Sequence, residues 1–99
     1  MTVYAFVPDL MDRSKVVAAG ANVVVVASPD APAAAGDVVV LDLARAGALD
    51  AVGPLVARGV RVVGFASHVD RDGIDAARVA GCEVYARSAF FGRLRELLG

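Results

Sequence analysis

The sequence predicts an α/β domain in which a five-stranded parallel sheet lies between two layers of helices. Short β-prone segments, most of them rich in valine, alternate with stretches that favour helices, and this alternation is typical of βαβ units with right-handed crossovers. An unbroken valine run, as in the second segment, suits a strand buried on both faces of a parallel sheet. The predicted strands are Val3–Val7, Asn22–Ala27, Val38–Leu41, Arg61–Ala66 and Glu83–Arg87.

A helix is expected between the first two strands. Pro8 ends the first strand because proline cannot donate a ladder hydrogen bond. Either Asp9 or Asp12 can cap the helix, which runs to Ala19. Gly20 is predicted to close it in the left-handed conformation.

The second crossover, Ser28–Gly36, departs from this alternation. It holds two prolines and four alanines, and it is too short and too interrupted for a full helix. We therefore predict a loop with at most one helical turn, so that the second crossover helix is reduced or absent.

Two further helices follow the third and fourth strands. The first is predicted over Asp50–Arg58, with Pro54 near its first turn, where proline is tolerated. Asp70 or Asp72 can cap the second, which ends before Gly81.

A last helix is predicted over Ala89–Leu98, capped by Ser88. Its apolar residues recur at helical spacing and form one stripe. Phe90 and Phe91 are adjacent, so both cannot point into one core, and one of them must face solvent or a partner. The stripe consists of Phe90, Phe91, Leu94, Leu97 and Leu98.

Composition narrows the function classes. The 99 residues are 58% apolar, so we expect residues 1–99 to fold as a single domain with its own core. Ten basic against eleven acidic residues argue against nucleic acid or an anionic membrane as the main partner, and permit self-association. The lone Cys82 cannot form an internal disulfide, and the chain begins without a signal-peptide pattern, so a cytoplasmic location is expected.

The chain resembles response-regulator receiver domains. The run Asp37–Leu43 looks like their third strand, which ends in the aspartate that accepts phosphate. The pair Ala80–Gly81, together with Tyr85 and Phe90, falls where a receiver has its Ala-Gly, strand-five aromatic and late phenylalanine. The resemblance covers nearly the whole chain except Ser28–Gly36, and it implies a flavodoxin-like sheet of strand order 2-1-3-4-5.

The resemblance also implies a set of site residues. Asp42 matches the phosphoacceptor, and Asp9 matches one acidic residue after the first strand, whereas Pro8 occupies the neighbouring acidic position. The candidate metal ligands are Asp9, Asp42 and Asp12, because Mg²⁺ prefers oxygen ligands. No cofactor is expected to be required, and Mg²⁺ binding is expected to be weak.

The switch and lysine positions depart from the receiver pattern. A gap-free alignment puts Ala66 at the switch hydroxyl, with Ser67 one place later, and Ser88 at the lysine, with Ala89 replacing the following proline. Successive strand side chains point to opposite faces, so Arg87 can substitute for the lysine only if the strand ends early. With Ser67, Ser88 and Arg87 as the switch and pocket candidates, the pattern resembles an eroded, pseudo-receiver site.

Each candidate also has a purely structural interpretation. Asp42 can cap a turn after the third strand, and Asp12 is more typical of a cap or a surface charge. Asp9 and Asp42 would repel each other without a cation, which would raise one of their pKa values. His68, the sole histidine, is expected at the polar rim, and Cys82 is expected to be buried and inert.

The leading hypothesis is a non-enzymatic, receiver-like signalling module. It would act through a protein partner or homodimerisation along the fifth strand and its flanking helices, with Tyr85, Arg87 and Phe91 as interface candidates. One alternative is a phosphorylatable single-domain response regulator with Asp42 as acceptor. Another is a small-ligand-binding flavodoxin-like domain with its site at the same sheet edge.

Overall fold

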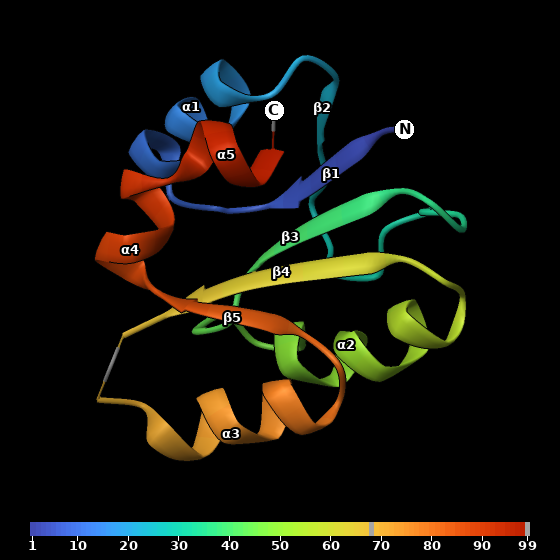
Figure 1. Cartoon of the computed structure of the whole chain (residues 1–99), viewed down its shortest axis with the longest axis vertical. Coiled ribbons are helices and arrows are strands. Elements are labelled where there is room, and N and C mark those ends of the chain that lie inside the picture. The colour runs from blue at the N-terminus through green and yellow to red at the C-terminus, as the bar shows by residue number, and fades with distance from the viewer. Residues whose placement is uncertain (68, 99) are drawn as a thin grey trace.

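The computed structural model describes residues 1–67 and 69–98 and contains a five-stranded parallel sheet (Figure 1). The strands lie in the order β2-β1-β3-β4-β5, and every neighbouring pair is parallel. The predicted fold class and strand order are therefore confirmed. Along the chain the elements are β1 (Val3–Phe6), α1 (Leu10–Ala19), β2 (Val23–Val25), β3 (Val38–Asp42), α2 (Ala48–Ala57), β4 (Arg61–Ala66), α3 (Arg71–Val79), β5 (Glu83–Ala86), α4 (Arg87–Gly92) and α5 (Leu94–Leu98).

Helices cover both faces of the sheet. Figure 1 shows α1, α4 and α5 on one face and α2 and α3 on the other. Side chains of β3 alternate between the two faces of the sheet. Val38 and Val40 pack on the face covered by α1, α4 and α5, and Val39 and Leu41 pack on the face covered by α2 and α3. All five residues of β3 are buried, because helices cover both faces of this central strand.

Strand β2 differs from its prediction. It is shorter than predicted, and Val24 and Val25 are each 42% exposed, so the expectation of a strand buried on both faces is wrong. The physical reason is its position at the edge of the sheet, next to a crossover that contains no helix between residues 26 and 37. The same crossover confirms the predicted loss of the second crossover helix.

Asp37 fastens this helix-free crossover to the sheet. Its carboxylate accepts hydrogen bonds from the backbone N–H of Ala34 and of Thr2, each at 3.0 Å. The bond from Ala34, followed by that from Thr2, holds the pKa of Asp37 below its ordinary value. Ala31 and Ala33 of the crossover are buried against the core on the α2 side.

We expect Asp37→Asn to lower the urea midpoint at neutral pH. The pKa of Asp37 is lower in the folded chain than in the unfolded chain. The stabilisation by its carboxylate is therefore complete above the pKa of the unfolded chain, about 3.9, and is lost as the pH falls through the pKa of the folded chain. The gap in midpoint between wild type and variant should therefore narrow below about pH 4. The exposed Asp75→Asn is the control, and a gap for Asp37→Asn that stays constant with pH would contradict the assignment.

The first helix begins at one of its two predicted caps. The carboxylate of Asp9 accepts a hydrogen bond from the backbone N–H of Asp12 at 3.0 Å, so Asp9 is the cap. The prediction that Gly20 is left-handed is wrong, because its backbone is extended, with φ −106°. A Cβ at Gly20 would clash with the Cγ2 methyl of Val23, so the close approach of α1 to β2 favours glycine here.

The helices on the other face start close to their predicted positions. Helix α2 begins at Ala48, two residues earlier than predicted, because Gly47 reverses the chain with φ +82°. Pro54 consequently lies in the second turn and not near the first. Asp70 caps α3 by accepting a hydrogen bond from the backbone N–H of Gly73 at 3.2 Å.

The last predicted helix starts earlier and divides in two. Strand β5 ends at Ala86, and α4 begins at Arg87, so Ser88 lies inside the helix and is not its cap, contrary to prediction. A residue before proline avoids helical dihedrals, and because position 89 is alanine Ser88 has no such restriction. The helical path breaks at Arg93, with φ −125° and ψ 20°, and resumes as α5.

Three aromatic rings join the last helices to the sheet. Phe90 is fully buried and stacks on Phe65 of β4 with ring centroids 4.8 Å apart. Phe91 meets both rings edge-on at 5.1 Å and is half-buried, as the adjacency of the two phenylalanines required. The cationic groups of Lys15 and Arg87 lie 5.4 and 5.0 Å from the Phe91 ring centroid.

We expect Phe90→Ala to lower the free energy of unfolding by about 3 to 5 kcal/mol, through lost burial and a cavity. Urea denaturation monitored by circular dichroism measures this value. Val79→Ala is the control, because Val79 is 89% exposed and its truncation should change stability by about 0.5 kcal/mol or less. A similar effect for the two variants would contradict the role given to the Phe65–Phe90 stack.

Candidate functional site

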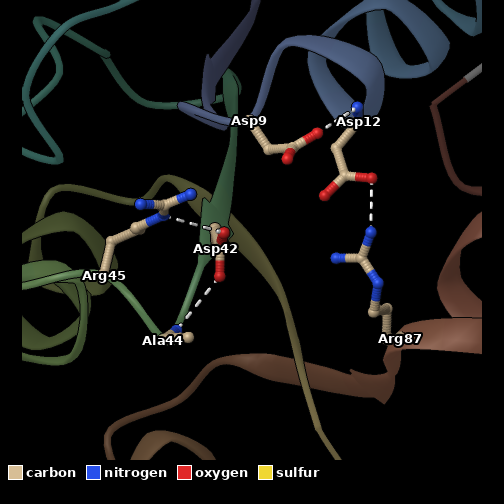
Figure 2. Close-up of polar contacts among 6 residues, drawn as sticks. All are labelled: Asp9, Asp12, Asp42, Ala44, Arg45 and Arg87. Carbon is tan, nitrogen blue, oxygen red and sulfur yellow. Dashed lines mark hydrogen bonds and ion pairs between the residues drawn. The ribbon is translucent and has the colours of Figure 1, made fainter.

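Charged side chains gather beyond the carboxyl ends of the strands, where open parallel sheets build their sites. Figure 2 shows Asp42 at the end of β3, Asp9 and Asp12 at the start of α1, Arg45 after β3 and Arg87 at the start of α4. Asp12 and Asp42 are the two buried charged side chains in the described part of the chain, at 3% and 7% exposure.

Asp42 holds the turn that follows β3. One carboxylate oxygen accepts a hydrogen bond from the backbone N–H of Ala44 at 3.1 Å, and the other lies 3.4 Å from Nε of Arg45 (Figure 2). The structural interpretation of Asp42 as a turn cap is therefore correct. The same residue lines a cavity of about 320 Å³, together with Ala44, Arg45, Phe65, Ala66, Ser67 and Arg87.

Asp12 forms an ion pair with Arg87, which follows it by 75 residues in the chain (Figure 2). The expectation that Asp12 is a cap or a surface charge is wrong, because its side chain turns inward to this guanidinium while Met11 beside it stays exposed. Arg87 can reach Asp12 because β5 ends at Ala86 and the chain turns directly into α4.

Arg87 is held from several sides. Its hydrogen bond with Asp12, and then the nearby negative charges of Asp12, Asp42 and Asp9, raise the pKa of its guanidinium. The guanidinium carbon also lies 5.7 Å from the ring centroid of Phe65, in addition to its contact with Phe91. The group is thus a permanent positive charge at the centre of the acidic edge.

Asp9 is exposed and acts as the cap of α1. The backbone N–H of Asp12 is the main cause that lowers the pKa of Asp9, with smaller contributions from Arg87 and Arg45. The pKa of Asp9 is therefore lowered and not raised, chiefly by the backbone N–H of Asp12, so the repulsion from Asp42 that the sequence suggested does not govern this carboxyl.

The three carboxylates do not form a ligand set for Mg²⁺ as folded. Within residues 1–67 and 69–98, no three Asp, Glu, His or Cys side chains are grouped so that they could hold a metal ion. Asp12 is engaged by Arg87, Asp42 by Arg45 and a backbone N–H, and Asp9 by the start of α1. Mg²⁺ demands near-octahedral oxygen geometry, and these paired carboxylates do not supply it, so no Mg²⁺ site is shown among the described residues.

Of the switch and pocket candidates, some line the cavity beside Asp42 and others do not. Ala66, the last residue of β4, and the exposed Ser67 both line it, and Ser67 is the one of the two that carries a hydroxyl. Ser88 is exposed in α4 and does not line it. His68 lies outside the described residues.

Cys82 is buried, as predicted, and burial raises the pKa of its thiol to about 12, so the thiol is protonated at neutral pH.

Arg45 is a site residue that the sequence interpretation missed. Its position three residues after Asp42 was the available signal, because an arginine at that spacing can fold back onto a carboxylate.

The structure is similar to a solved receiver domain. The crystal structure of the response regulator receiver domain from Rhodospirillum rubrum aligns with a TM-score of 0.71 at 16% sequence identity, covering 98% of this chain and 90% of that chain. The chain has the fold of a response-regulator receiver domain. No protein-family model and no curated protein matches the sequence.

Within this receiver fold, Asp42 lies at the end of β3, where the sequence resemblance placed the acceptor. Ser88, which the sequence resemblance matched to the lysine, lies in α4, and the neighbouring Arg87 is paired with Asp12. No helix in the described part of the chain combines the length and the apolar character needed to cross a membrane.

We expect the Asp12–Arg87 pair to couple by about 1 to 2 kcal/mol in a double-mutant cycle with alanine at each position. This coupling free energy is smaller than expected for a fully buried ion pair because the Arg87 side chain is 51% exposed. Urea denaturation of the wild type, both single variants and the double variant measures the coupling.

The Arg93–Glu96 pair is the matched control for this cycle. Its side chains are 53% and 70% exposed, so its coupling should be about 0.5 kcal/mol or less. Equal coupling in the two cycles would contradict the importance assigned to Asp12 burial.

Proposed function

We propose that this chain is a receiver-like regulatory module that acts through protein contact and does not carry out phosphoryl transfer. The observation that supports this proposal is the ion pair between the buried Asp12 and Arg87. In a working receiver, acidic residues hold Mg²⁺ and a lysine neutralises the phosphoryl group, as the sequence resemblance implies. Here the buried acid and the nearest cation neutralise each other.

The chemistry of arginine supports the same proposal. A guanidinium is a planar group with its donors in a fixed fork, whereas an ammonium is a compact charge that can follow a moving phosphoryl group. Arg87 also lies over the rings of Phe65 and Phe91. An arginine in this place keeps the charge of the usual lysine but not its compact geometry.

A phosphorylatable receiver with Asp42 as acceptor is the second candidate. One observation favours it: the cavity beside Asp42 is also lined by the hydroxyl-bearing Ser67 and the cationic Arg87. A carboxylate, a hydroxyl and a positive charge around one cavity are the groups that this chemistry needs.

The proposed contact surface runs along β5 and the start of α4. Tyr85 is half-buried on β5, and its hydroxyl lies 3.5 Å from a carboxylate oxygen of Glu83. Phe91 is half-buried, and Arg87 is more than half exposed on its side chain. We propose a protein partner or a second copy of this chain on this surface, not nucleic acid or a membrane, and a cytoplasmic location.

Amide NMR spectra recorded during addition of Mg²⁺ and then beryllofluoride, an aspartyl-phosphate mimic, test the proposal. We expect no specific shifts around Asp9, Asp42 and Ser67, because Arg87 already occupies the acidic edge. Specific shifts there that disappear in Asp42→Asn would instead establish a working phosphoacceptor.

A variant sharpens the same experiment. Arg87→Ala removes the resident guanidinium and should make the amides near Asp9 and Asp12 respond to Mg²⁺ where the wild type does not. Arg93→Ala, which removes an arginine paired with Glu96 on the surface, should behave as wild type. No response in Arg87→Ala would show that Arg87 is not what keeps Mg²⁺ out.

A further inference from the structure

A groove lies between α1 and the junction of α4 with α5, on the face where Figure 1 places all three helices. Its volume is about 440 Å³. Helix α1 contributes Lys15, Ala18 and Ala19, which lie on one side of the helix at spacings of three and four residues. The opposite wall is the segment 91–96, where the helical path breaks at Arg93.

The charged residues of the groove are mostly basic. Lys15, Arg93 and Arg95 line it against a single carboxylate, that of Glu96. Glu96 is engaged by Nε of Arg93 at 3.1 Å. Among the residues that the structure describes, neither Lys15 nor Arg95 has a carboxylate within ion-pair distance. The groove is thus a local basic site on a chain of net charge −1.

Apolar surface lies between these cations. Phe91 is half-buried in the groove wall, and the ammonium of Lys15 lies 5.4 Å from its ring centroid. Ala18 and Ala19 have short side chains and leave room above α1. Basic groups around an apolar surface match a ligand that carries carboxylates beside apolar side chains.

We propose that this groove docks an acidic, amphipathic segment of a partner protein. The inference rests on the proposed function as a contact module, and it names the chemistry of the partner. Charge complementarity selects an acidic occupant, and the apolar surface around Phe91 selects a peptide over a simple anion. A nucleic acid is disfavoured because the chain as a whole is not basic.

Substitution of Gly92 can block the groove. Gly92 lies in the wall of the groove with a helical conformation, and a Cβ built there would meet nothing within 4 Å. The Cβ of a substituted residue is therefore accommodated, and Gly92→Glu adds a carboxylate to the wall of the groove. Gly53→Glu is the matched control, because Gly53 lies in α2 on the other face of the sheet and its Cβ would also meet nothing.

The experiment is fluorescence anisotropy with the full chain and a labelled peptide of alternating glutamate and leucine. A peptide of alternating lysine and leucine is the charge control. We expect the acidic peptide to bind wild type and Gly53→Glu equally and to bind Gly92→Glu and Lys15→Glu roughly tenfold more weakly. Amide NMR shifts on peptide addition should lie around Lys15, Phe91 and Arg95.

Several outcomes would overturn the inference. One is that the acidic peptide binds Gly92→Glu as tightly as Gly53→Glu, and another is that the basic peptide binds wild type as tightly as the acidic peptide does. A third is that the NMR shifts are confined to another surface. A fourth is that an RNA oligonucleotide or anionic vesicles displace the acidic peptide at a lower concentration than unlabelled acidic peptide does. Beryllofluoride binding at Asp42 would contradict the proposed function and leave the peptide result unaffected, so the two failures are distinguishable.

Discussion

The ion pair between the carboxylate of Asp12 and the guanidinium of Arg87 holds α1 and α4 to each other. Removing a carboxylate from water is costly unless a cation replaces the lost hydration, so a buried Asp12 requires a positive charge from elsewhere in the chain. The early end of β5 brings Arg87 to that place. The aromatic rings of Phe65 and Phe91 lie beneath the same guanidinium, so this contact also positions α4 over the sheet.

The edge of the sheet is consequently neutralised by the protein itself. Asp12 faces Arg87, Asp42 faces Arg45, and Asp9 faces the backbone at the start of α1. Each carboxylate thus has a hydrogen-bond donor or a cation of the chain itself beside it.

The sequence predicted the central strands best and the positions set by distant contacts worst. Strand β4 has its predicted bounds because a buried central strand shows itself in continuous apolar residues. The valine run of β2 looks the same at an edge as at the centre, so its exposure could not be read from it. The burial of Asp12 depends on its pairing with Arg87, 75 residues away, which local patterns do not contain.

The shortness of β2 limits how well this edge of the sheet can pair with a strand of another chain. A run of valines at a free sheet edge is the kind of segment that adds strands from other chains. Only three of its residues form the strand, Val23–Val25, which leaves a short template. Pro29 and Pro32 follow soon after, and each lacks the N–H that an extended intermolecular ladder would use. A short edge strand followed by two prolines is a poor template for adding further strands.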